Sequence, residues 1–224
     1  MGNNASAKDK APPAVEAVGK EWDKWANDWD KMGPVGSFNR EFLARVKEIY
    51  TLDRSSTECL EVGSGTGLLT LPLSGCCSRV DSCDVSAEMI KVLDQKLKDE
   101  NVTNVNTWAG DITSDETNLM GPYDLLLSGS VLTFCPDMPA TLESMSKRLK
   151  PGGKMIHMLF KSKKRAPEGT KYFPDGVHPE QLKEITNKIK GLKVDYVGDG
   201  VSIKAFWWFP FFKMNWQVLV ATKE

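Results

Sequence analysis

Apolar residues recur every three or four positions near the start of the chain and then give way to short apolar runs. The first set comprises Val15, Val18, Trp22, Trp25, Trp29 and Met32. This spacing places all six on one stripe of an amphipathic helix. We expect "GPVG" at 33–36 to end that helix and a second helix to follow over about 39–50. Residues 1–13 are small, polar and proline-bearing, so we expect a disordered tail there.

Beyond residue 50, short apolar runs alternate with helical patterns. The predicted strands are 58–62, 79–84, 104–109, 123–128, 154–160, 192–199 and 214–222. The predicted helices are 66–74, 86–99, 137–149 and 178–190. Nearly continuous apolar strands that alternate with helices predict an α/β fold, a doubly wound and mostly parallel seven-stranded sheet with helices on both faces. We therefore expect the tail at 1–13, an N-terminal helical cap at 14–50 and one α/β domain at 51–224.

Composition narrows the functional classes. The chain has 224 residues, 41% of them hydrophobic, and a formal net charge of -1, so it can build a core but shows no basic bias. Nucleic acid is therefore not an expected partner. Its five cysteines lack CxxC spacing, which favours reduced, buried thiols in a cytoplasmic protein over disulfides or a metal site. No apolar run reaches the ~18 residues that a membrane span requires.

The first six residues, "MGNNAS", match the pattern for N-myristoylation, with Gly2 as the acceptor. The alternative is a polar tail that begins Met-Gly by chance, and the pattern leaves both open. One myristoyl chain gives only marginal membrane attachment, so peripheral membrane contact would need a second apolar surface. The aromatic run "FWWFPFF" at 206–212 could supply it, or could be core packing or the wall of an acceptor site.

The stretch "CLEVGSGTGLLT" at 59–70 predicts a strand, a tight turn and the start of a helix. Gly63, Gly65 and Gly67 allow positive φ and close approach of the backbone to a ligand. A dinucleotide fingerprint, G-x-G-x-x-G, requires its third glycine one residue later, where this chain has Leu68. The turn therefore indicates a nucleotide-like ligand, and its glycine spacing departs from the dinucleotide pattern.

"LEVGSGTGLLT" closely resembles motif I of the class I S-adenosylmethionine-dependent methyltransferases, the small-molecule type with a Rossmann-like fold. Further segments resemble that family's elements in the same order, namely "VDSCDVSAEMI", "WAGDIT", "YDLLLSGSVLTF" and "MSKRLKPGGKMIHML". The resemblance covers roughly residues 40–160, and the expected strands near the C-terminus fit the family's reversed final hairpin. It implies that S-adenosyl-L-methionine is the cofactor of the domain at 51–224.

The resemblance also implies roles for individual residues. The methionine and sulfonium side of the cofactor would be lined by Glu61, Gly63, Ser64, Gly65 and Gly67. Asp84 would accept hydrogen bonds from the ribose hydroxyls. The adenine would be held by Val85, Met89, Gly110, Asp111 and Ile112, with the Asp111 carboxylate accepting from its amino group. Ser128 would face the methyl-donor side. Alternatively, Met89 is ordinary core and Asp111 is a turn residue.

The methyl acceptor is less well indicated. His157 and His178 are weak candidates for a catalytic base; His157 is otherwise a core residue and His178 a helix cap. Trp25 and Trp29 resemble the aromatic helix that closes the cofactor cleft in small-molecule members of the family. The segment "SGSVLTF" lacks the [DNS]PP[YF] motif of nucleobase amine methyltransferases. We therefore predict a small-molecule acceptor; the alternatives are a protein methyltransferase and a non-catalytic, membrane-associated protein with the tryptophan stripe as its docking face.

Overall fold

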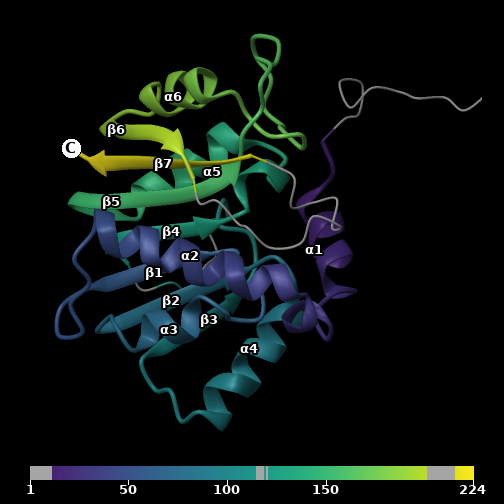
Figure 1. Cartoon of the computed structure of the whole chain (residues 1–224), viewed down its shortest axis with the longest axis vertical. Coiled ribbons are helices and arrows are strands. Elements are labelled where there is room, and N and C mark those ends of the chain that lie inside the picture. Colours follow the sequence, from purple (N-terminus) through teal and green to yellow (C-terminus); the bar gives the residue numbers. More distant parts are fainter. Residues whose placement is uncertain (1–11, 115–118, 120, 201–214) are drawn as a thin grey trace, which may run out of the picture.

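The computed structural model describes residues 12–114, 119, 121–200 and 215–224. Seven strands form one sheet in the order β3-β2-β1-β4-β5-β7-β6 (Figure 1). Their bounds are β1 Glu58–Val62, β2 Arg79–Asp84, β3 Val105–Ala109, β4 Tyr123–Gly129, β5 Leu149–Phe160, β6 Leu192–Asp199 and β7 Trp216–Lys223. Strands β1 to β5 pair in parallel, and β7 runs antiparallel to both β5 and β6. The predicted doubly wound, mostly parallel α/β sheet is confirmed.

Helices cover both faces of this sheet. They are α1 Val15–Asp23, η2 Trp29–Lys31, α2 Gly33–Ile49, α3 Thr70–Ser74, α4 Ala87–Asp99, η3 Leu132–Phe134, α5 Met138–Lys147 and α6 Pro179–Asn187. One apolar cluster joins the sheet to Phe42 of α2 and Leu73 of α3. A second joins it to Leu142 of α5 and Leu182 of α6. The core therefore consists of two layers, one on each side of the strands.

The strand order reverses between β1 and β4. From β1 the chain moves outward through β2 to β3, and it then returns to place β4 on the other side of β1. Such a reversal leaves a crevice at the carboxyl ends of the strands, where ligands bind in open α/β sheets. In Figure 1, α1 lies beyond these strand ends rather than against a face of the sheet.

The N-terminal helices differ from the prediction. The expected single helix over 15–32 ends at Asp23, and a turn leads to the short η2. A straight helix would separate Trp22 from Trp29 by about 10 Å along its axis, whereas the turn brings their ring centroids to 5.4 Å in an edge-to-face contact. "GPVG" does not end a helix but begins α2, because a proline is well tolerated in the first helical turn.

Two other predicted bounds are wrong for local reasons. The helix expected at 66–74 begins only at Thr70, because Gly67 has φ +88° and cannot be helical. The strand expected at 154–160 begins instead at Leu149, so the Pro-Gly-Gly segment at 151–153 lies inside β5. There the register shifts from Tyr123↔Leu149 to Leu125↔Lys154, so four residues of β5 bulge opposite one residue of β4.

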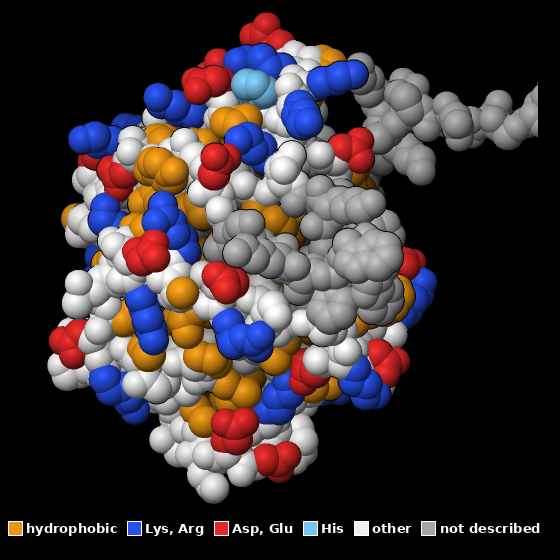
Figure 2. All heavy atoms as spheres, in the orientation of Figure 1, with side chains coloured by type: hydrophobic (Ala, Val, Ile, Leu, Met, Phe, Trp, Pro, Cys, Tyr) orange, Lys and Arg blue, Asp and Glu red, His pale blue; other side chains and the backbone are white. Residues whose placement is uncertain are grey.

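All five cysteines are free; Cys59, Cys77 and Cys83 are buried as predicted, whereas Cys76 and Cys135 are half-buried. Figure 2 shows basic and acidic side chains interspersed on one face of the molecule. Among the described residues, no helix is both long and apolar enough to cross a bilayer. Gly2 and the aromatic run at 206–212, which carried the membrane hypothesis, lie outside the described residues.

Candidate functional site

A cavity of about 490 Å³ lies at the carboxyl ends of the parallel strands. Its floor consists of residues that follow β1, β2, β3 and β4, and its walls come from the N-terminal helices, β5 and β7. Of the residues predicted for the site, those that line it are Trp25, Trp29, Gly63, Ser64, Gly65, Asp84, Val85, Met89, Gly110, Asp111 and Ile112. The fold therefore brings four separate motifs to one cavity.

The glycine turn after β1 has the backbone conformation that its sequence predicts. Gly63, Gly65 and Gly67 have φ of +75°, +53° and +88°. Packing adds a second requirement, since a Cβ on Gly63 would lie 2.1 Å from Val131 Cγ2 and one on Gly67 would lie 2.3 Å from Leu93 Cδ1. The conformation and the contacts both require glycine at these two positions.

Ser64, within this turn, carries an unsatisfied polar atom. Its side chain is 6% exposed, and the Oγ atom has no hydrogen-bond partner. A buried hydroxyl without a partner is costly, and such groups commonly mark the place of a ligand. Ser64 lines the cavity, so the turn offers a hydroxyl as well as a close backbone approach.

Asp84, the last residue of β2, is tied to the turn. Its Oδ2 accepts a hydrogen bond from Gly65 N at 2.8 Å, and its Oδ1 accepts one from Ser86 N at 2.9 Å. Burial raises the pKa of this carboxyl above its ordinary value, and the two backbone donors partly oppose that shift. A carboxylate has about four acceptor sites, so Asp84 keeps capacity for ligand hydroxyls after making these two bonds.

The residues after β3 form a second wall. Asp111 accepts hydrogen bonds from Thr113 N at 2.9 Å and Thr113 Oγ1 at 2.7 Å, which makes it a turn residue as well as a cavity residue. A Cβ on Gly110 would lie 2.3 Å from Trp108 Cζ2, so any larger residue there would require the Trp108 ring to move. Met89 is 2% exposed and belongs both to the packed interior and to the cavity lining.

Glu61, Gly67 and Ser128 do not line the cavity. Glu61 accepts a hydrogen bond from Thr70 Oγ1 at 2.6 Å behind the turn. Burial raises its pKa to about 8, so near pH 7 it is largely protonated and presents little negative charge. Ser128 is buried and bonded to His157. The side chains of Glu61 and Ser128 project from strands. They therefore lie in the packed layers on the faces of the sheet and not in the cavity beyond the strand ends.

Neither histidine lies at the cavity. His157, on β5, is fully buried, with Nδ1 2.6 Å from Ser128 Oγ. Burial lowers its pKa to about 3. His178 occupies the N-cap position of α6 but makes no side-chain capping bond. The weak prediction of a histidine base therefore receives no support from the geometry.

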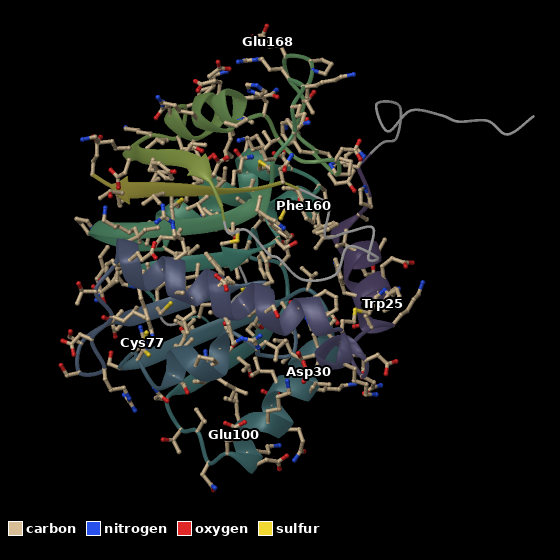
Figure 3. The ribbon with its side chains drawn as sticks, in the orientation of Figure 1. Trp25, Asp30, Cys77, Glu100, Phe160 and Glu168 are labelled. Atoms are coloured by element: carbon tan, nitrogen blue, oxygen red, sulfur yellow. The ribbon has the colours of Figure 1, made fainter. Side chains whose placement is uncertain are left out.

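The N-terminal segment 15–31 is anchored to the cofactor motifs at two places. Asp23 Oδ1 accepts hydrogen bonds from Ser86 Oγ at 2.6 Å and Glu88 N at 3.2 Å. Asp30 accepts one from Thr66 Oγ1 at 2.5 Å and pairs with Lys96 Nζ at 2.5 Å. Figure 3 shows Asp30 and Trp25 on this segment, at the same end of the sheet as Phe160.

A chain of aromatic contacts lines the cavity. Trp29 lies beside Gly65, and successive edge-to-face or tilted contacts of 4.4–5.9 Å join its ring to the far end. We call this set the aromatic wall: Trp29, Trp22, Phe134, Phe160, Trp216 and Phe38. Trp25 also lines the cavity but is 48% exposed, so it forms part of the rim.

Several cavity residues were not predicted. Ser130, Val131 and Phe134 follow β4 in the segment "SGSVLTF", where the family resemblance implied a role only for Ser128. Ser130 has φ +63°, an unusual conformation for a residue other than glycine. Phe160 and Trp216 end and begin strands far along the chain, and no local pattern signals that they meet the cavity.

The comparisons with known proteins agree with this geometry. Residues 60–155 match a family model described as a methyltransferase domain. A demethylmenaquinone methyltransferase of Lactococcus lactis subsp. lactis (strain IL1403) is 29% identical over 145 residues, covering 63% of this chain and 57% of that relative. A ubiquinone biosynthesis O-methyltransferase of Xanthomonas oryzae pv. oryzae (strain PXO99A) is 25% identical over 176 residues, 69% of this chain and 71% of that relative. The chain thus spans less than two thirds of the Lactococcus relative.

Solved structures share the fold. The magnesium protoporphyrin IX methyltransferase from Synechocystis PCC 6803, with bound S-adenosylmethionine, has a TM-score of 0.69 at 15% identity, covering 96% of this chain and 100% of that one. The [4+2]-cyclase SpnF has a TM-score of 0.73 at 16% identity, covering 96% and 97%. Because one of these is named as a cyclase, the shared fold alone does not identify a reaction.

Proposed function

We propose that this chain, which belongs to the class I S-adenosylmethionine-dependent methyltransferases, transfers a methyl group from S-adenosylmethionine to an apolar small molecule. The observation that carries the proposal is the single cavity at the strand ends. The glycine turn and Asp84 line one end of this cavity, which we call the cofactor end. The aromatic wall lines the other end, which we call the acceptor end. A donor and an acceptor held in one enclosure meet the geometric requirement of a direct transfer.

The residues of the cofactor end fit S-adenosylmethionine. Ser64 offers a buried hydroxyl without a partner, and the positive-φ glycines let a ligand approach the backbone closely. We assign the ribose hydroxyls to the remaining acceptor sites of Asp84, and the adenine to the wall of Val85, Met89, Gly110, Asp111 and Ile112. When bound, the cofactor supplies a methyl group that its sulfonium already activates, so the chain's own task is alignment and exclusion of water.

At the acceptor end, the described residues supply position more than proton transfer. The aromatic wall offers apolar surface, and both histidines lie away from the cavity. Alignment of a nucleophile with the methyl group can contribute several of the ~7–11 kcal/mol available from positioning. The relatives named for demethylmenaquinone and ubiquinone biosynthesis support a small-molecule acceptor over a protein.

Calorimetric titration of S-adenosylhomocysteine into the wild type and Asp84→Ala tests the cofactor site. We expect at least a ~100-fold loss of affinity in the variant, because the two ribose hydroxyls of the ligand lose their hydrogen bonds to the Asp84 carboxylate. Asp99→Ala, an exposed change at the end of α4, is the matched control and should bind like the wild type. If folded wild type fails to bind, the assignment is wrong. If it binds, incubation with methyl-labelled donor and candidate acceptors tests the transfer itself.

For the N-terminus we propose myristoylation of Gly2 and peripheral membrane contact, on the residues "MGNNAS" alone. Mass spectrometry of protein expressed in eukaryotic cells should show a myristoyl adduct on Gly2. An unmodified N-terminus would remove this proposal and leave the methyltransferase proposal unchanged.

A further inference from the structure

Trp216, the first residue of β7, carries a hydrogen-bond donor with no partner at the acceptor end. The residue is 9% exposed and lines the cavity, and its indole Nε1 has no hydrogen-bond partner in the described structure. An indole N–H only donates, and burial without a partner costs free energy that a bound acceptor group would recover. Trp216 and Ser64 are thus two buried, unpartnered polar residues lining one cavity, and Ser64 belongs to the cofactor end.

The rings around Trp216 restrict the shape of a ligand. Its ring centroid lies 4.4 Å from that of Phe160 and 4.5 Å from that of Phe38, both in tilted contact. Phe160 continues the wall to Phe134 with an edge-to-face contact at 5.9 Å. Aromatic rings in such arrangements favour a flat, unsaturated partner, which gains offset or edge contacts beyond its buried area.

We propose that the methyl acceptor is a flat, conjugated molecule bearing an oxygen, and that Trp216 Nε1–H donates a hydrogen bond to this oxygen. This inference rests on the proposed function and names its substrate class and a specificity-determining residue. The wall provides affinity for the flat skeleton. The Trp216 donor fixes which edge of the molecule enters the acceptor end, and therefore which atom faces the methyl group.

Two probes separate the wall from the hydrogen bond: 2-naphthol, which is flat and carries an oxygen, and naphthalene, which lacks it. Both fluoresce, so equilibrium dialysis gives their affinities for protein saturated with S-adenosylhomocysteine. In Trp216→Phe we expect 2-naphthol to bind about 3- to 10-fold more weakly, the effect of one neutral hydrogen bond. Naphthalene should change by less than about twofold, because phenylalanine keeps an aromatic ring there.

Trp25→Phe is the matched control, because it removes an indole N–H from the exposed rim of the same cavity. It should leave the ratio of the two affinities unchanged. A measurement that needs no variant uses wild type labelled with ¹⁵N at tryptophan. There the Trp216 indole N–H resonance should move downfield with 2-naphthol and not with naphthalene.

The outcomes are distinguishable. An equal loss of both probes in Trp216→Phe, or no loss of either, overturns the hydrogen bond. Failure of both probes to bind protein that does bind S-adenosylhomocysteine overturns the flat acceptor and leaves the proposed function standing. Failure of folded wild type to bind S-adenosylhomocysteine instead overturns the proposed function.

Discussion

At the cofactor end of the cavity, backbone N–H groups and carboxylates come from the ends of β1, β2 and β3 and the turns that directly follow them. At the acceptor end, the rings come from positions as distant as Trp22 and Trp216. The first set is positioned by local conformation. Asp84, for example, is fixed by two backbone donors within the adjoining turns. The second set comes together through contacts between distant segments, namely the anchors of segment 15–31, the pairing of β5 with β7, and ring-to-ring packing.

This difference predicts how each end responds to change. A backbone-held site depends on a few positions that tolerate no other residue, so single substitutions there should abolish binding. A packed aromatic wall distributes its contribution over many contacts of about 0.5–1.5 kcal/mol each. Single changes at the acceptor end should therefore shift which ligand binds more than whether the cofactor binds.

Gly63→Ala should have the largest effect, because Gly63 of the cofactor end packs against Val131, which lies in the same segment as Phe134 of the aromatic wall. The new Cβ meets Val131 and forces φ +75° on an alanine, so we expect the free energy of unfolding to fall by about 2–5 kcal/mol. Gly152 has nearly the same φ, +79°, but a Cβ there would have no atom within 4 Å. Gly152→Ala should therefore lower the free energy of unfolding by only about 1–2 kcal/mol. Urea denaturation measures both changes, and Gly63→Ala should also lose S-adenosylhomocysteine binding.

A second change tests the contact itself. Adding Val131→Ala to Gly63→Ala should restore part of the lost stability, since it removes the atom that the new Cβ meets. Equal destabilisation by Gly63→Ala and Gly152→Ala would mean that backbone conformation alone sets the loss, and that the contact with Val131 contributes nothing.

The next effect concerns pH and the buried His157. Its folded-state pKa of about 3 lies below the unfolded value near 6.5, so only the unfolded chain gains this proton as the pH falls from about 6.5. Stability should therefore decrease by about 2 kcal/mol between pH 7 and pH 5 on account of this one group. Urea midpoints of the wild type and His157→Asn at the two pH values measure it. A variant that keeps the full pH dependence would contradict this account.

Asp30→Ala should have the smallest effect and would show whether the N-terminal segment supports the cofactor end. It removes the bonds to Thr66 and Lys96. Because Thr66 lies within the glycine turn, we expect S-adenosylhomocysteine to bind about 3- to 10-fold more weakly by calorimetry. Asp28→Ala removes only an exposed pair with Lys31 and serves as the control. Equal affinities for these two variants would separate the segment from cofactor binding.

The sequence predicted the parts of the molecule that depend on local order. The glycine turn, Asp84 at a strand end and the helix at 86–99, found as Ala87–Asp99, follow from short-range patterns. The break between α1 and η2 was missed because it depends on Asp23 and Asp30 reaching partners far along the chain. A helical stripe predicts which residues face inward, but not where the helix must turn.

Apart from Trp25 and Trp29, the residues of the acceptor end were missed for a related reason. Trp216 and Phe160 look like ordinary apolar strand residues in the sequence, and only the pairing of β5 with the antiparallel β7 brings them together. Glu61 and Ser128 show the opposite error. They sit in motifs next to the cavity, yet strand geometry points each into the packed layers. Motif order identifies a site, whereas side-chain direction decides which residues reach it.

The anchors of segment 15–31 also have a kinetic consequence. This segment lines the cavity while Asp23 and Asp30 bond it to the loop after β2 and to the glycine turn. Under the proposed function, release of spent cofactor past this segment would require these bonds to open and close again. The residence time of S-adenosylhomocysteine, and with it the maximum turnover rate, should be governed by two aspartates that touch neither the methyl group nor its acceptor.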